Sequence, residues 1–458
     1  MTTLTSVRFS SVSPQTVRSS SSGANSANPK PAPVAPGFSG ESRFEAAPSR
    51  SGANAAPSSP AEKWALQEME KLFEPAASTL RENGSTVTTD AADVESPSNS
   101  KTGARGWQAT GQLKANERLE QQRLASLSPQ QRAQYVAVRE ATYNRASNPV
   151  AALALQKLLF EGKLPGGRDL TGKGTVLDYL ASAARGDRLD GRVDKNTFVT
   201  DLIQELATPS AINQGTRGTC APTAMSINLA LNHPAEYARI MGDLASPSGT
   251  VTLADGKTTL TREAETSFMP DGSGRALTQR LMAPAFMEAS NGERAYNDWN
   301  DSGAGASATG LDALHDAVYG RNMAHKELHS SAARDEAMMQ IDSELASGQN
   351  VLVGIWWNAD GGHEVLVTGT EKLNGQDYVQ FINPWGTEER MLRSVFHSRL
   401  IGMNYDPAEA ARPGPAAPVW PVPGPFVTPR PWNRPGPVAQ PAGFGIDSLR
   451  RLFTPIAA

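Results

Sequence analysis

Cys220 is the only cysteine in this chain of 458 residues. A single thiol cannot form an internal disulfide, so it is either a small buried hydrophobe or a nucleophile. A nucleophilic thiol needs a lowered pKa, a base that exchanges its proton, and hydrogen-bond donors for the developing oxyanion. The sequence contains a candidate for each of these three needs.

The residues around Cys220 predict a helix that begins at the thiol. A turn-rich segment, Gly215 to Thr219, precedes the cysteine, and Pro222 suits the first turn of a helix. The dipole at a helix N-terminus favours the thiolate over the thiol. Gln214 lies six residues upstream, where its side-chain amide and the Cys220 N–H would provide two donors to an oxyanion.

Two downstream segments supply a base and a residue that orients it. His363 stands at the start of a predicted strand, where an imidazole can act as base and then as acid. Asn383 ends the next predicted strand, 20 residues later. Neighbouring antiparallel strands would bring its Oδ1 against the imidazole and select one tautomer. Trp385 is expected to shield this hydrogen bond from water.

Together these segments resemble a papain-fold cysteine peptidase of the calpain type, over residues 209 to 400. The three motifs of that type are Gln-Gly-x-x-Gly-x-Cys, Gly-His-x-x-x-Val-Thr-Gly and Asn-Pro-Trp-Gly. They are matched in the same order by Gln214, Gly215, Gly218 and Cys220, then by Gly362, His363, Val367, Thr368 and Gly369, and then by the run from Asn383 to Gly386.

The resemblance implies a catalytic role for four residues: Cys220 as nucleophile, His363 as base, Asn383 as orienting residue and Gln214 as oxyanion donor. Trp385, Gly218 and Gly362 are implied to bind substrate or to shield the triad. These families usually have tryptophan directly after the nucleophile, whereas this chain has Ala221. The missing aromatic wall is expected to change substrate preference and to leave the triad intact.

The implied activity is that of a cysteine endopeptidase that cleaves protein substrates. The same geometry also serves a cysteine amidase, deamidase or transglutaminase-like enzyme, and a third interpretation is a catalytically silent binding scaffold. A free cysteine by itself is usually a core residue. The enzyme interpretation is preferred because three motifs occur in the expected order, each with its expected strand or helix context.

No metal or cofactor is predicted. The sequence has no EF-hand loop, and the acidic segment from Asn297 to Asp301 is too irregular to indicate a calcium site, so calcium dependence stays open. His315, His325 and His329 cluster in the sequence without a cysteine or carboxylate that completes a metal site.

The elements that must position these residues predict an α+β protein with a papain-like fold. A helical left subdomain would carry the nucleophile helix, and a small antiparallel sheet would form the right subdomain. The predicted organisation is a disordered segment at 1–60, a short helix at 61–83, a linker at 84–109, a helical region at 110–208, the peptidase domain at 209–405 and a proline-rich tail at 406–458.

The two ends of the chain differ in composition from the middle. Residues 1–40 lack Asp and Glu and are rich in Ser and Thr. They resemble the export signal of a bacterial type III secreted effector, which implies delivery into the host cell cytoplasm. A plain disordered tail of a cytoplasmic protein and a transit peptide are the alternatives, and no apolar stretch indicates a Sec signal peptide. The proline-rich tail would suit an SH3-like partner or serve as a linker.

Composition also excludes some classes of partner. The net charge is −4, and no run of Lys and Arg would neutralise phosphates, so nucleic-acid binding is not expected. No apolar run approaches the roughly 20 residues of a membrane-spanning helix.

Overall fold

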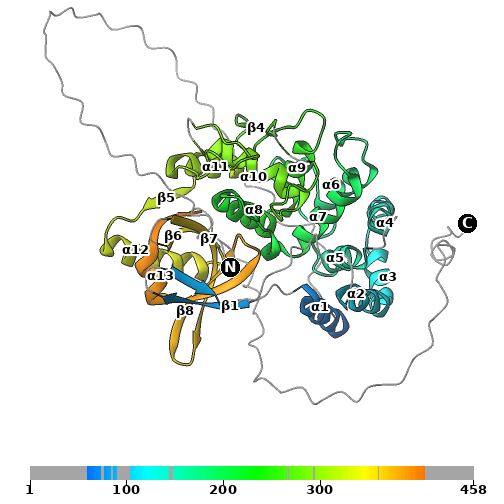
Figure 1. Ribbon diagram of the computed structural model, residues 1–458. Helices are drawn as coiled ribbons and strands as arrows, with labels where there is room; N and C mark the ends of the chain where they lie inside the picture. The colour runs from blue at the N-terminus through cyan, green and yellow to red at the C-terminus, as the bar shows by residue number, and fades with distance from the viewer. Residues whose placement is uncertain are drawn as a thin grey trace, which may run out of the picture. The chain divides into compact units, whose positions relative to one another are not determined.

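Helix α8 (Cys220–Asn232) lies between a layer of helices and a β-sheet (Figure 1). Every residue from Cys220 to Ala230 is buried, which is the pattern of a helix covered on all sides. The helix begins at Cys220 and has Pro222 in its first turn, so the predicted start is confirmed. The computed structural model describes residues 59–73, 77–83, 86–89, 104–143, 148–264, 266, 268–291, 294–358 and 361–407.

The sheet has eight strands in the order β2-β1-β9-β8-β7-β6-β10-β5. Neighbouring strands are antiparallel, except that β1 pairs with β9 in parallel. The predicted antiparallel pairing is present from β5 to β9, and the parallel pairing of β1 with β9 was not predicted. The strands are β1 (Ala77–Asn83), β2 (Thr86–Thr89), β5 (Ala324–Glu327), β6 (Val351–Asn358), β7 (Gly361–Leu373), β8 (Gln376–Asn383), β9 (Thr387–Leu392) and β10 (Leu400–Tyr405).

The central strands β6 and β7 are buried on both faces, which explains their nearly continuous apolar sequences. Side chains alternate between the faces along each strand. Leu352 and Leu366 belong to the apolar core that also contains α8, whereas Val353 and Val365 belong to a second core. That second core is covered by α12 (Ser331–Ala346) and α13 (Arg393–Arg399).

The helical layer shares one continuous core with α8. Phe160 and Phe198, from helices upstream of residue 209, are fully buried in the same cluster as Met225 of α8. Apolar packing thus continues across residues 208 and 209, where the helical region was predicted to end. The helices are α1 (Pro60–Phe73), α2 (Ala104–Ala115), α3 (Glu117–Ala125), α4 (Pro129–Tyr143), α5 (Pro149–Phe160), α6 (Val176–Arg185), α7 (Lys195–Ala207), α9 (Pro234–Leu244), α10 (Leu277–Ser290) and α11 (Ala308–Tyr319).

The segment before residue 110 differs from its prediction in two ways. The helix predicted at 61–83 ends at Phe73, and residues 77–83 form β1. Pro75 lies between them in the sequence, and proline disfavours helix at the residue before it. The predicted linker at 84–109 contains β2 and the start of α2. Pairing of β1 with β9 makes this segment part of the sheet.

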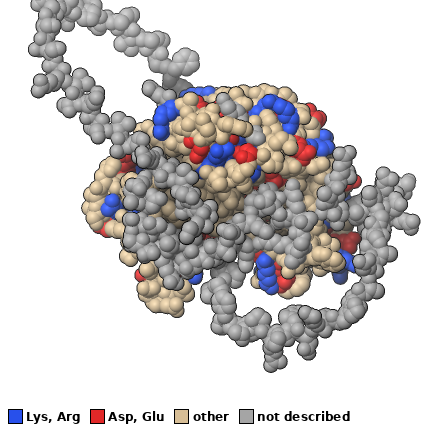
Figure 2. Space-filling model, viewed as in Figure 1, with Lys and Arg blue, Asp and Glu red and all other residues tan. Residues whose placement is uncertain are grey.

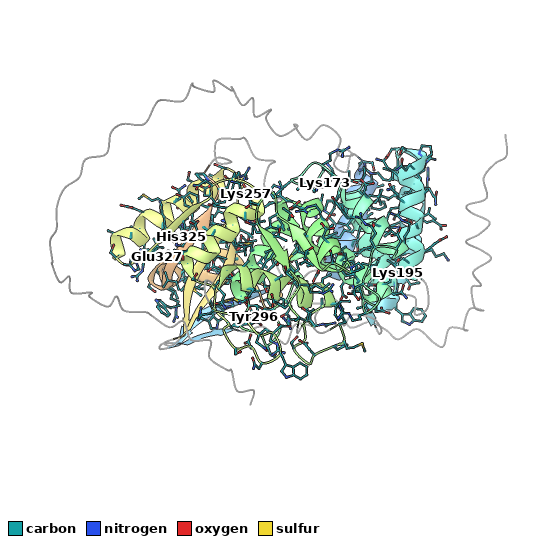
Figure 3. The ribbon with its side chains drawn as sticks, turned by 90° about the horizontal axis from the view of Figure 1, so that it is seen from above. Lys173, Lys195, Lys257, Tyr296, His325 and Glu327 are labelled. Atoms are coloured by element: carbon teal, nitrogen blue, oxygen red, sulfur yellow. The ribbon has the colours of Figure 1, made fainter. Side chains whose placement is uncertain are left out.

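Several smaller features complete the fold. A short hairpin, β3 (Thr250–Thr252) and β4 (Thr259–Thr261), stands apart from the main sheet. One turn of 3-10 helix, η2 (Pro209–Ala211), precedes the segment that leads to Cys220. The outer strand β5 carries His325 and Glu327 (Figure 3).

The surface and the ends give fewer constraints on function. Acidic and basic side chains are interspersed where described residues are visible in Figure 2. Within the described residues, no helix combines the length and apolarity needed to cross a bilayer. The predicted secretion signal at 1–60 falls almost entirely outside the described residues, as does the proline-rich tail after residue 407, so both stay predictions.

Candidate active site

The thiol of Cys220 lies against the beginning of β7. Its side chain is buried, with 4% of the residue surface exposed. The backbone N–H of Glu364 is near enough to the thiol to lower its pKa, as are the N–H groups of Cys220 and Ala221 at the helix start. Because Glu364 directly follows His363, the fold brings the cysteine to the stretch of β7 that carries the predicted base, 143 positions away along the chain.

His363 and Asn383 form the predicted hydrogen bond. The His363 Nε2 atom lies 2.9 Å from the Asn383 Oδ1 atom, and both residues are buried. His363 is near the start of β7 and Asn383 ends β8, the neighbouring antiparallel strand. Since Asn383 occupies Nε2, Nδ1 is the ring nitrogen left to exchange a proton with a thiol.

Glu389 holds the amide of Asn383 in place. The Asn383 Nδ2 atom donates to Glu389 Oε2 at 3.1 Å, and the Thr387 hydroxyl donates to Glu389 Oε1 at 2.6 Å. With its NH₂ group bound to a carboxylate, the amide must present its oxygen to the imidazole. Sequence reasoning missed Glu389, because a glutamate in a strand carries no signal of what it faces.

Two tryptophans enclose the imidazole. The Trp385 ring stacks on the His363 ring with centroids 4.5 Å apart and an angle of 21° between the planes. Trp357 meets both rings edge-on, at 4.9 and 5.0 Å. The backbone N–H of Trp385 also donates to Asn383 Oδ1 at 3.2 Å. Trp385 therefore lies where shielding of the His363–Asn383 hydrogen bond was predicted, and Trp357 adds a second wall.

Gln214 and Gly218 differ in part from their predicted arrangement. The Gln214 Nε2 atom donates one hydrogen bond to the Arg217 carbonyl oxygen at 2.7 Å, which leaves its second N–H for an oxyanion. The Gly218 N–H donates to Asp301 Oδ2 at 2.8 Å and so is not available to bind substrate. Gly362 is buried and pairs with Trp356 across the start of β7.

A buried polar network supports the loop that precedes Cys220. The Tyr296 hydroxyl, on a loop labelled in Figure 3, donates to Asp301 Oδ1 at 3.0 Å. Arg275 pairs with Asp298 at 2.8 Å and with Asp271 at 2.7 Å. The irregular acidic segment thus has a structural role in the described fold. Its link to Gly218 spans 83 residues, which is why spacing alone did not reveal it.

The thiol and the imidazole are both held in their neutral forms. Burial raises the pKa of Cys220 to about 11, although the N–H of Glu364 and those of the helix start act in the opposite direction. Burial lowers the pKa of His363 to about 4, and the Asn383 hydrogen bond opposes this shift. The predicted stabilisation of a thiolate by the helix start is therefore outweighed by burial in this structure.

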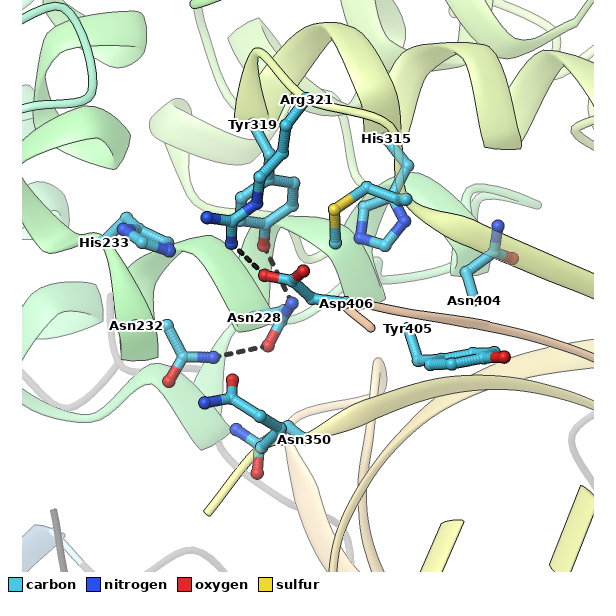
Figure 4. A pocket seen from close by; sticks show the side chains of 12 residues that line it. Asn228, Asn232, His233, His315, Tyr319, Arg321, Asn350, Asn404, Tyr405 and Asp406 are labelled. Carbon is cyan, nitrogen blue, oxygen red and sulfur yellow. Dashed lines mark hydrogen bonds and ion pairs between the residues drawn. The ribbon is translucent and has the colours of Figure 1, made fainter. Parts of the chain in front are cut away.

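A polar pocket lies at the opposite end of α8 (Figure 4). Asn228 begins its wall, eight residues and about 12 Å of helix from Cys220. The Asn228 Nδ2 atom donates to the Tyr319 hydroxyl at 2.8 Å. His315 also lines the pocket, and burial lowers its pKa to about 3. This pocket is distinct from the thiol site.

Within the described residues, no group of three or more His, Cys, Asp or Glu side chains is arranged to hold a metal ion. Comparison with protein-family models, with curated proteins and with solved structures found no significant match to this chain. The assignment of function therefore depends on the residues of the site and their geometry.

Proposed function

We propose that this chain is a cysteine endopeptidase with a papain-like fold, in which Cys220, His363 and Asn383 form the catalytic triad. Two observations support the proposal. His363 and Asn383 form a hydrogen bond across β7 and β8, and the Cys220 thiol lies near the backbone of Glu364, the residue after His363. The bond of 2.9 Å between His363 and Asn383, stacked under Trp385, is the arrangement expected of an oriented catalytic base.

In the first half of the reaction, Cys220 Sγ attacks the carbonyl carbon of a peptide bond while His363 Nδ1 takes the thiol proton. A carbon–sulfur bond forms, and the carbonyl electrons move to the oxygen. The Cys220 N–H and the second Gln214 N–H stabilise this oxyanion. As the carbon–nitrogen bond breaks, the imidazolium gives its proton to the leaving amine, and a thioester remains.

In the second half, water attacks the thioester carbonyl and His363 takes a proton from the water. The carbon–sulfur bond breaks, the proton returns to sulfur, and a carboxylic acid leaves. Because the resting pair is neutral, the base acts during the attack on the carbonyl, and no preformed ion pair is needed. Asn383 keeps Nδ1 aimed at the thiol in both halves.

The test is a comparison of protein cleavage products in host-cell lysate treated with wild type, Cys220→Ala or His363→Ala. Each substitution is expected to lower cleavage by about 10⁴-fold, because the members of such a triad act as one unit. His329→Ala is the matched control, since this imidazole is exposed and pairs with Glu327 at the surface. It should retain wild-type cleavage.

Three other results would contradict the endopeptidase proposal. Side-chain mass changes without new N-termini would indicate a deamidase or amidase instead. Crosslinked products would indicate transglutaminase-like transfer. Identical products from wild type and Cys220→Ala would indicate a scaffold without thiol chemistry.

A further inference from the structure

Glu364 has a carboxyl group near the Cys220 thiol, and the proposed mechanism gives this group no role. The backbone N–H of Glu364 lowers the pKa of the Cys220 thiol, and the charge of its carboxylate raises that pKa. The side chain is only partly exposed. Among the described residues, no Lys, Arg or His forms an ion pair with Glu364, and burial alone raises the pKa of its carboxyl to about 8.

The direction of the Glu364 side chain follows from strand alternation. Leu366, two residues further along β7, lies in the core that contains α8, so Glu364 is on the α8 face of the sheet. On β6, Leu352 lies in the same core, so Gly354 and Trp356 follow on the same face. Glu364 pairs directly with Gly354.

The absence of a side chain at Gly354 lets the Glu364 carboxyl group and Ile401 lie close over the backbone of β6. A Cβ atom built on Gly354 would lie 3.2 Å from Glu364 Oε2 and 3.1 Å from Ile401 Cγ1. The carboxyl group and Ile401 therefore converge over the bare backbone of β6. Ile401, on β10, is itself partly exposed, as is Glu364, so both side chains reach the protein surface.

Trp356 adds an exposed apolar side chain on the same face of the sheet as Glu364. Its side chain is exposed, at 41%, although it is one of the largest apolar side chains of the sheet. It pairs with Gly362, the residue immediately before His363, so the indole is close to the reacting groups along the strand pair. Arg399 Nη1 donates to the Trp356 carbonyl oxygen at 2.8 Å, which fixes the backbone of this residue.

Resting on the proposed function, we propose that Glu364, Trp356, Ile401 and the backbone of Gly354 form a substrate subsite that takes a basic side chain, lysine or arginine. The carboxylate would pair with the cationic head group. The indole and Ile401 would contact its apolar stem, and the indole face also attracts a cation.

Occupation of this subsite also affects the nucleophile. An ionised Glu364 raises the pKa of the Cys220 thiol, because two negative charges close together repel each other. A bound lysine or arginine neutralises that carboxylate. The matching substrate would thus remove a charge that opposes thiolate formation, whereas a neutral side chain in the subsite would not.

The test uses peptide acyloxymethyl ketones that alkylate Cys220, with alanine at every position except one. That position carries arginine or citrulline, which has the same shape without the charge, and each position is varied in turn. The second-order rate of labelling is measured by intact-protein mass. At one position, wild type should react with the arginine probe about tenfold faster or more, the usual gain from a charge-assisted hydrogen bond.

Three variants assign the preference to the subsite. Glu364→Gln should bring the ratio of arginine to citrulline rates to near one, while the all-alanine probe still labels Cys220. Gly354→Ala should reduce the ratio, because the added Cβ crowds Glu364 and Ile401. Glu371→Gln is the matched control on the same strand; this glutamate pairs with Arg390 instead, and the ratio should be unchanged.

The protonation of Glu364 gives a second readout. Its pKa of about 8 means that the Glu364 carboxyl group is mostly protonated below that pH when no substrate is bound. Because only the ionised carboxylate attracts arginine, the ratio of arginine to citrulline rates of wild type should increase from about pH 6 to 9. Equal rates for the two probes at every position, or an arginine preference that survives in Glu364→Gln, would contradict the proposed subsite and leave the proposed peptidase function unaffected. Failure of every probe to label Cys220 would overturn the proposed peptidase as well.

Discussion

Cys220 and His363 are both neutral in this structure, although a cysteine and a histidine at such positions could also form a thiolate–imidazolium pair. Both groups are buried, and burial disfavours the charged form of each, so the thiol keeps its proton and the imidazole stays neutral. Motif and helix position favour an activated thiolate, but they do not report how much water reaches the sulfur. Desolvation is decided by residues brought from elsewhere in the chain.

This neutral pair predicts how the thiol reacts in the absence of substrate. With a pKa near 11, the thiolate fraction of Cys220 should rise about tenfold for each pH unit between about pH 6 and 10. The rate of iodoacetamide alkylation, followed by intact mass, should rise in parallel. The unfolded protein is the control, since its thiol should titrate near about 8.5. A folded-state rate that is constant from pH 5 to 9 would instead require a thiolate–imidazolium pair.

At the scale of elements, the turn before α8 determines where Gln214, the proposed oxyanion donor, lies. Gly215 has a φ of +61°, in the left-handed region, and a Cβ there would lie 2.0 Å from the Ser273 carbonyl oxygen. The Thr216 N–H donates to that same oxygen at 2.9 Å. Only glycine allows this close approach, and the adjacent Gln214 depends on it.

Gly215→Ala should therefore destabilise the protein by at least about 2 kcal/mol, through backbone strain and the clash with Ser273. The Cys220 labelling rate should also fall, because the loop with Gln214 must move. Thermal unfolding and probe labelling measure the two effects. Gly242→Ala, in α9 and with open space around it, is the control and should be neutral or stabilising by about 1 kcal/mol. Equal stability of both variants would contradict this account.

At the scale of the whole molecule, the described residues on both sides of residue 209 share one continuous helical core. Helices α5 and α7 bury Phe160 and Phe198 in the cluster that contains α8. Strand β1, from the beginning of the described chain, pairs with β9, the strand of Glu389. Parts on both sides of residue 209 thus hold the site.

A fragment of residues 209–407 is accordingly expected not to unfold cooperatively. It would expose the apolar surface that α5 and α7 cover, and such patches cause aggregation. A fragment of residues 59–407 should show a cooperative thermal transition by circular dichroism and should still be labelled at Cys220. A cooperative transition of the shorter fragment, with low binding of a hydrophobic dye, would show that the helical block is dispensable.

Local signals in the sequence determined much of the site. Proline near the start of α8, the strand pattern around His363 and the ending of β8 at Asn383 each depend on residues within a few positions. They correctly predicted the elements and the hydrogen bond of 2.9 Å between His363 and Asn383. Whether these residues catalyse peptide cleavage stays a proposal.

The tertiary structure alone decided what surrounds those residues. The bond from Gly218 to Asp301, the carboxylate of Glu389 behind Asn383 and the unpaired Glu364 beside the thiol all depend on where distant segments meet. Burial, and with it the protonation of Cys220 and His363, is a property of the assembled core. Side chain types and spacing describe only neighbours along the chain, so they predict the reactive groups but not their environment.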